Sequence, residues 1–405
     1  MNQHTQAGTA TRRSGKDALA QALRDSRKDT LATFAVYEAA LERTGLAVPQ
    51  SAQLNPPLWE LGHIGWFQEY WLARNADHAR AQHADPDAPR RASQRGNADA
   101  LYDSGRVAHD TRWSLPLPDA NATRDDLEAQ LAGSLAMLGT LDGDDAALYF
   151  HRLVLLHEDM HHEAALYSAQ ALGLPISDAR WQAQALTTPR VDIALDAGPW
   201  RLGHDGAGFA FDNELVAFEA MLDATRIDSR VVSWAEFLPF VDAGGYADAR
   251  WWSDAGRAWL KQHGLQHPRY LRRDGAAWQR ESFGQWLTLD MTLPACHLTL
   301  HEAQAWCAWA GRRLPSEAQW ERAALTQPDA FDWGSVWEWT ASDFVPYAGF
   351  VAHPYRDYSE PWFGARTVLR GASFLTQPRM HHARYRNFFT AERNDVAAGF
   401  RSCAA

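Results

Sequence analysis

The sequence predicts an α+β protein in which a helical N-terminal domain precedes an irregular domain of loops and short strands. Two observations carry this prediction. Before residue 173, apolar residues recur at helical spacing in four long stretches. After about residue 186, glycine and aromatic residues become frequent and the helical spacing fades. A chain of 405 residues is also long for one domain, so two domains are expected.

The N-terminal domain is predicted to span residues 16–185, after a disordered tail at residues 1–15. Pro56 and Pro57 suit the first turn of its second helix, and Thr123 precedes the third. Short or polar connections favour an antiparallel four-helix bundle, a fold that builds metal sites from inward-facing side chains. The helices are predicted at residues 16–43, 57–74, 124–138 and 145–172.

The second domain is predicted to span residues 186–405. Helical spacing is limited there to residues 233–243, 300–311 and 316–325. The remainder is expected to be rich in loops, with short strands between turn residues.

Composition excludes several functional classes. The net charge of -11 argues against nucleic-acid binding, which needs clustered Lys and Arg. Cys296, Cys307 and Cys403 have unrelated spacings, so neither a disulfide framework nor a zinc ribbon is expected, and a reducing compartment fits. No run approaches the roughly 20 apolar residues of a membrane span, and the polar N-terminus is unlike a signal peptide. A cytoplasmic protein is expected.

A histidine pair on the fourth predicted helix is the strongest sign of function. His157 and His161 are four residues apart, so they project from one helix face and suit a single metal ion. His63, on the aromatic-rich second helix, is the best third ligand. Three neutral imidazoles hold a divalent ion and leave positions for substrates. Such histidine pairs also occur as exposed or core residues, so the pair alone leaves both interpretations open.

Glu163 follows the pair closely but is a poor direct ligand. It lies about 200° around the helix from His161. A role behind the ligands, or a structural role, suits it better.

Four segments of the second domain resemble the signature of the formylglycine-generating-enzyme fold, a mixed, irregular domain of C-type-lectin type. True formylglycine-generating enzymes oxidise their substrates with two cysteines near an Arg-Tyr-Arg segment. Here Arg384-Tyr385-Arg386 has no cysteine near it, so that thiol chemistry is excluded. The matching segments are residues 309–321, 336–340, 369–373 and 398–401.

The N-terminal half resembles the four-helix domain of the DinB type, and the two halves together resemble the ergothioneine-type sulfoxide synthases. These are non-haem iron enzymes that use O2 to join sulfur to C2 of the imidazole of hercynine. The resemblance implies iron(II), Fe(2+), bound by His63, His157 and His161. It also implies a proton-donating tyrosine from the second domain, for which Tyr355, with Tyr358 beside it, is the best match; packing alone is the other interpretation of these tyrosines.

The same resemblance suggests the substrates. Asn387 and Phe388 match the family's hercynine-binding segment, and an aromatic ring suits a trimethylammonium group. Phe389 stands where members that use gamma-glutamylcysteine have an aspartate for the donor's amino group. A different donor is therefore implied, and residues 101–113 look like the selenoneine synthase branch, which uses a seleno-sugar.

A basic cluster, Arg90, Arg91 and Arg95, lies where sulfur-using members keep arginines for a donor carboxylate. A solvated loop is the competing interpretation of this cluster. Three alternatives to a selenoneine synthase stay open: a sulfoxide synthase that uses gamma-glutamylcysteine or cysteine, a DinB-type metal-dependent thiol transferase, and a ligand-binding module without catalysis.

Overall fold

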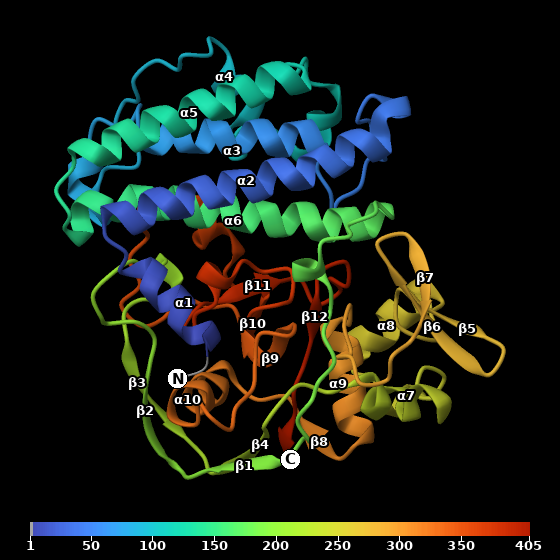
Figure 1. The fold of residues 1–405 in the computed structure, drawn as a ribbon. Coiled ribbons are helices and arrows are strands. Elements are labelled where there is room, and N and C mark those ends of the chain that lie inside the picture. Colours follow the sequence, from blue (N-terminus) through green and yellow to red (C-terminus); the bar gives the residue numbers. More distant parts are fainter. Residues whose placement is uncertain (1–2) are drawn as a thin grey trace.

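The computed structural model describes residues 3–405, with side chains from residue 7 onward. A layer of helices lies on a mixed second domain, and α6 is the helix of that layer that faces the second domain (Figure 1). Helix α6 packs against α2 and α3, and α3 packs against α5. The four long helices of the described residues are α2 (Lys16–Leu41), α3 (Pro57–Trp71), α5 (Ala120–Thr140) and α6 (Asp145–Leu172).

All four occur where the sequence predicts helices, and capping explains their ends. Asp144 accepts a hydrogen bond from the Ala147 N–H at the start of α6, and Gly173 ends it with a φ of 67°. Helix α5 begins earlier than predicted, because Asp119 caps the first turn by accepting from the Ala122 N–H. Between α3 and α5 the chain forms η2 (His78–His83), α4 (Ala98–Tyr102) and η3 (His109–Ser114).

The prediction of a disordered tail at residues 1–15 is wrong for the described part of that segment. Gln3–Arg12 forms helix α1, which packs against the second domain. The Arg12 guanidinium donates to both oxygens of the buried Glu214, at 2.5 and 2.8 Å. Such distant partners order a short polar helix that would be marginal alone. Residues 1 and 2 lie outside the described residues.

The second domain is built from small sheets joined by long loops. In the described chain, β1, β4, β13 and β8 form one sheet in that order, and β11, β10, β9 and β12 form another. The pair β2–β3 and the sheet β5–β6–β7 complete it. The strands are β1 (Asp192–Leu195), β2 (Gly198–Leu202), β3 (Phe218–Leu222), β4 (Thr225–Asp228), β5 (Leu271–Asp274), β6 (Ala277–Ser282), β7 (Gln285–Thr288), β8 (Arg312–Arg313), β9 (Trp337–Asp343), β10 (Thr367–Gly371), β11 (Asn387–Phe389), β12 (Ala398–Gly399) and β13 (Cys403–Ala404).

Three helices of this domain match the predicted positions: α7 (Trp234–Asp242), α9 (Leu300–Trp309) and α10 (Glu317–Thr326). Helix α8 (Asp254–His263) was missed, because it is mostly exposed and buries little besides Trp259. Ser253 caps it by accepting from the Gly256 N–H.

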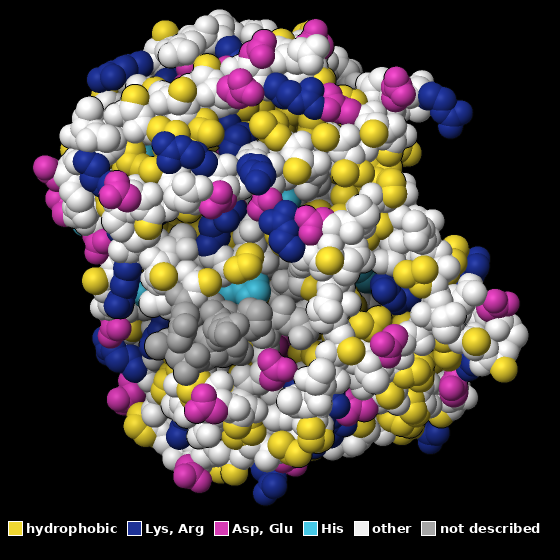
Figure 2. All heavy atoms as spheres, viewed as in Figure 1, with side chains coloured by type: hydrophobic (Ala, Val, Ile, Leu, Met, Phe, Trp, Pro, Cys, Tyr) yellow, Lys and Arg dark blue, Asp and Glu magenta, His cyan; other side chains and the backbone are white. Residues whose placement is uncertain are grey.

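One hydrophobic core continues from the helical layer into the second domain, and it contains many tryptophans. Basic and acidic side chains are mixed over the face seen in Figure 2. Along the described chain, no helix has both the length and the apolar character needed to cross a membrane.

Candidate metal centre

Three histidines from two helices meet inside the helical layer. His63 comes from α3, and His157 and His161 come from successive turns of α6. One ring nitrogen of each lies within 4.8 Å of the others. The packing of α3 against α6 therefore brings His63, the candidate third ligand, to the pair that helical spacing singled out.

Hydrogen bonds on the far side of two rings leave their Nε2 atoms available. His63 Nδ1 donates to the Tyr102 carbonyl at 2.8 Å, and His161 Nδ1 donates to Glu60 Oε2 at 2.5 Å. The Nε2 atom of His157 is buried and has no hydrogen-bond partner in the described structure. An unpartnered buried nitrogen beside two available ones fits a divalent metal ion.

Burial also sets the protonation of this group. It lowers the pKa of His63 to about 3 and holds the pKa of His157 well below its ordinary value. Both imidazoles are therefore neutral near pH 7, the form in which histidine binds metals.

Aromatic rings fix the orientation of the imidazoles. Phe67 stacks on His157 with ring centroids 3.4 Å apart, and Trp59 stacks on His63 at 4.9 Å. Trp66 also stacks on His63, with ring centroids 5.5 Å apart. These rings cover His63 and His157 and limit rotation of their side chains.

The two predicted tyrosines lie near each other but contact different residues. The Tyr355 ring lies 6.0 Å from the His157 ring and 4.8 Å from Phe67. Tyr358 instead shares a hydrogen bond of 2.8 Å with the hydroxyl of Tyr385, a residue given no role by the sequence. Burial raises the pKa of Tyr355 above its ordinary value, so its hydroxyl keeps its proton.

The loop that carries both tyrosines is held by one turn of the second domain. Asp212 accepts hydrogen bonds from the Ser359 hydroxyl at 2.5 Å and from the His353 N–H at 3.3 Å. Asn213 donates to the same serine at 3.1 Å. Burial raises the pKa of Asp212 to about 6.

A charged cavity of about 480 Å³, here the arginine cavity, lies between the helical layer and the tyrosine loop. Arg90 Nη1 donates to Asn75 at 3.0 Å, while its Nε and Nη2 are buried without a partner in the described structure. Its guanidinium lies 4.6 Å from the Tyr70 ring. The charged and aromatic lining residues are Trp66, Tyr70, Trp71, Arg74, Asp87, Arg90, Asp99, Asp103, Arg106, Tyr355, Arg356 and Asp357.

The other two arginines of the basic cluster do not line this cavity. The side chain of Arg91 is exposed, because neighbouring residues of an extended loop point in opposite directions. Arg95 forms an ion pair of 3.0 Å with Asp126. The expected substrate contact of Arg91 therefore has no support in the geometry.

A second cavity of about 230 Å³, here the aromatic cavity, includes His161 in its wall. Strand β11 brings Asn387, Phe388 and Phe389 to it, and the Phe388 ring stacks on Phe344 at 4.0 Å. Its remaining lining residues include Met160, Glu163, Tyr167, Trp337, Tyr358 and Tyr385.

Glu163 joins the two domains rather than supporting a histidine. Its Oε1 atom accepts from Trp337 Nε1 at 2.7 Å and from the hydroxyls of Ser373 and Thr376, each at 2.9 Å.

The carboxylate that accepts the hydrogen bond of His161 belongs to Glu60, which was not predicted from the sequence. Its position three residues before His63 on the same helix was the available signal.

Comparison with known proteins extends over nearly the whole chain. Hercynine oxygenase of Mycolicibacterium smegmatis is 31% identical over 95% of this chain and 98% of its own length. Hercynine oxygenase of Mycobacterium tuberculosis is 30% identical over 86% of this chain and 90% of its own. Formylglycine-generating enzyme of Bos taurus is 31% identical over 35% of this chain and 43% of its own length.

The C-terminal part also matches a domain family. Residues 178–335 and 331–405 match the sulfatase-modifying factor enzyme 1-like domain, FGE-sulfatase. This match covers the region in which the sequence resembles the formylglycine-generating-enzyme fold. The chain therefore belongs to the hercynine oxygenase family, as its resemblance to the ergothioneine-type sulfoxide synthases predicted.

Proposed function

We propose that this protein is a non-haem iron(II) enzyme that uses O2 to join a chalcogen atom to C2 of the imidazole of hercynine. The observation that carries the proposal is the meeting of His63, His157 and His161 in a member of the hercynine oxygenase family. Iron(II) bound by three neutral imidazoles would supply open positions for the donor chalcogen and for O2 activation.

The aromatic cavity is the proposed site for hercynine. Its rings suit a trimethylammonium group, and Glu163 adds a carboxylate to the same wall. Asn387 offers an amide to the substrate carboxylate, with Phe388 beside it. In this position the imidazole of hercynine would lie next to His161, which lines the same cavity.

Tyr355 is the proposed proton donor. Its ring lies 6.0 Å from the His157 ring, and burial keeps its hydroxyl protonated at neutral pH. Tyr358, hydrogen-bonded to Tyr385, is proposed to bound the hercynine site and to support Tyr355 through ring packing at 5.9 Å.

The arginine cavity is the proposed donor site, and a seleno-sugar is the proposed donor. Two buried nitrogens of Arg90, Nε and Nη2, have no partner in the described structure, and their N–H groups suit hydroxyl or carboxylate oxygens. Residues 103–106 line this cavity and belong to the segment that resembles the selenoneine synthase branch, which favours a seleno-sugar over an amino-acid donor. Gamma-glutamylcysteine or cysteine is the alternative donor. A thiol transferase is less well supported, because both cavities use residues of the second domain.

The test is an anaerobically iron-loaded sample given hercynine, O2 and either a seleno-sugar or gamma-glutamylcysteine. Oxygen consumption and mass spectrometry of the products are measured together. A C–Se product formed preferentially is expected. Failure to consume O2 with either donor would contradict the synthase proposal, and a preference for gamma-glutamylcysteine would contradict the selenium assignment alone.

A further inference from the structure

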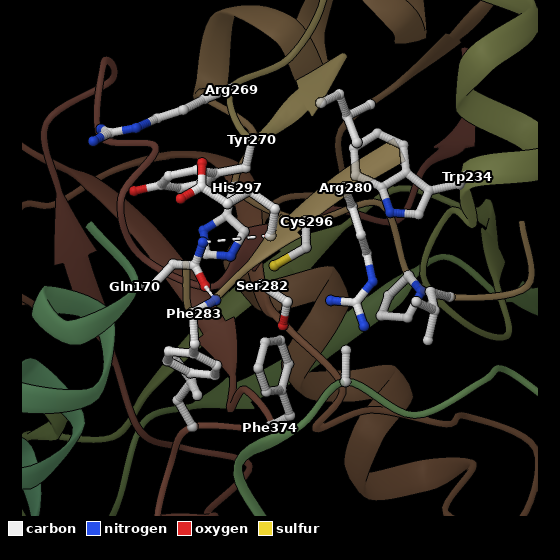
Figure 3. A pocket seen from close by; sticks show the side chains of 16 residues that line it. Gln170, Trp234, Arg269, Tyr270, Arg280, Ser282, Phe283, Cys296, His297 and Phe374 are labelled. Carbon is white, nitrogen blue, oxygen red and sulfur yellow. Dashed lines mark hydrogen bonds between the residues drawn. The ribbon is translucent and has the colours of Figure 1, made fainter. Parts of the chain in front are cut away.

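A small cavity lies in the second domain and shares no lining residue with the arginine cavity or the aromatic cavity (Figure 3). It is bounded by the sheet β5–β6–β7, the loop at residues 293–297 and Phe374. Gln170 of α6 also lines it, about 20 Å along that helix from His157 at 1.5 Å per residue. Its volume is about 40 Å³, room for a few water-sized groups.

Arg280 brings a positive charge to this cavity. It lies two residues before Ser282 on β6, so both side chains leave the strand on one face. In Figure 3 its guanidinium points into the group formed by Ser282 and Cys296. Burial lowers its pKa, and no hydrogen bond or ion pair to another described residue offsets that burial. The other lining guanidinium, Arg269, donates to Asn394 at 3.0 Å.

The charge of Asp290 raises the pKa of Arg280, but by less than burial lowers it. Glu281 also lines the cavity, but it follows Arg280 directly and so projects to the opposite face of the strand. Asp290 accepts a hydrogen bond from the Thr292 hydroxyl at 2.7 Å. Burial raises the pKa of the Cys296 thiol to about 12, so that group is neutral.

Two further polar atoms of the lining residues have no hydrogen-bond partner in the described structure. They are Tyr270 Oη and His297 Nδ1, both of which are buried. Buried polar atoms are usually satisfied by protein, water or a ligand. Tyr270, Phe283 and His297 also have positive φ angles of 62°, 47° and 60°, a backbone region that non-glycine residues rarely adopt and that is enriched at binding sites.

We propose that this cavity binds a short-chain carboxylate, whose oxygens pair with Arg280 and whose apolar end packs against Phe283 and Phe374. The charge calls for an anion, since a guanidinium pairs with two carboxylate oxygens at once. The walls are mainly apolar, which favours an organic acid over inorganic phosphate. The small volume limits the ligand to about two to four carbon atoms.

The test uses propionate as the probe and the full chain as the protein. Saturation-transfer NMR should show saturable binding with a Kd of about 1 mM or tighter. Propionamide has the same shape without the charge, and it should bind at least about tenfold more weakly. Equal binding of the two compounds, or no saturable binding of propionate, would overturn the proposal.

Two variants locate the binding. Arg280→Met should weaken propionate binding at least about tenfold. The control Arg272→Met removes an exposed arginine of β5, whose guanidinium lies 4.1 Å from the Trp286 ring, and should leave binding unchanged. If Arg280→Met does not fold, Arg280→Lys keeps the charge and should bind propionate more weakly than the parent. Unchanged binding in the Arg280 variant would place the probe elsewhere and overturn the assignment, as would equally tight binding of phosphate.

Discussion

The arginine cavity and the aromatic cavity lie near the same group of histidines but differ in chemistry. The aromatic cavity has His161 in its wall, whereas the arginine cavity reaches the group through Trp66 and Tyr355, whose rings pack near His63 and His157. The arginine cavity is about twice as large, and its walls carry several guanidinium and carboxylate groups. The aromatic cavity is lined mainly by rings, with Glu163 and Asn387 among its polar groups. One cavity therefore suits a polar, flexible ligand, and the other suits a flat ring with a cationic end.

The tyrosine loop contributes to both cavities, which explains how one short segment can serve two substrates. Tyr355 lines the arginine cavity, and Tyr358, three residues later, lines the aromatic cavity. Because the cavities differ, a substitution in one cavity should change the binding of one substrate only. A substitution of a histidine should change the reaction of both substrates. Four predictions test this division.

His157→Ala should have the largest effect and act on both substrates. It removes one of three ligands, so Fe(2+) affinity should fall by about a hundredfold or more and activity should be lost. Iron content after anaerobic loading and desalting measures this. His162→Asn is the control, because His162 hydrogen-bonds Thr33 at 3.0 Å rather than joining the three histidines. Equal iron content in both variants would contradict the proposed site.

Tyr355→Phe should rank second and act on chemistry rather than on binding. Without the hydroxyl, the yield of C–Se or C–S product per O2 consumed should fall by about a hundredfold, the scale of general acid catalysis. Iron content should stay at the parental level. Tyr358→Phe is the matched comparison and should reduce the yield less. Full coupling in Tyr355→Phe would move the proton-donor role away from this residue.

Asn387→Ala and Arg90→Met should have smaller effects, and each should raise the KM of a different substrate. The first should raise the KM for hercynine by about tenfold and leave the donor KM near its parental value. The second should do the reverse, because Arg90 loses its hydrogen bonds in the other cavity. Steady-state kinetics with each substrate varied in turn measure this. If both variants changed the same KM, the division between the cavities would be wrong.

Asp212→Asn should have the smallest effect, on the loop shared by the two cavities. The pKa of Asp212 is raised from 3.8 to about 6 by burial, so the folded state holds its proton more tightly than the unfolded state. Its contribution to stability is complete below about pH 4 and is lost as the pH rises through 6, on the order of 3 kcal/mol in total. Urea unfolding at pH 5 and pH 8 should show a smaller loss of stability in the variant. Identical pH dependence in both proteins would contradict this role for Asp212.

Local patterns made the helices and the three histidines predictable. Helical spacing alone places His157 and His161 on one face, and capping residues mark the ends of α6. Spacing cannot show the approach of α3, which adds His63; this residue was a candidate because of its aromatic-rich helix, and the family resemblance supported it. The residues that sequence reasoning missed depend on contacts between distant segments: Glu60 reaches His161 across 101 positions, and α1 is ordered by Glu214, 202 positions from Arg12. Propensity contains no information about such partners.

Glu163 has a consequence for how the molecule unfolds. It lies two residues after His161 on α6, and one oxygen of its carboxylate accepts hydrogen bonds from three donors of the second domain. The same helix therefore carries two proposed metal ligands on one face and the domain junction on another. Separation of the domains would replace these three hydrogen bonds with bonds to water, at a net cost of about 1 kcal/mol for each bond, so neither half is expected to melt alone. Metal binding and domain association are then thermodynamically linked: an ion that fixes α6 also strengthens the junction, and the chain unfolds as one cooperative unit.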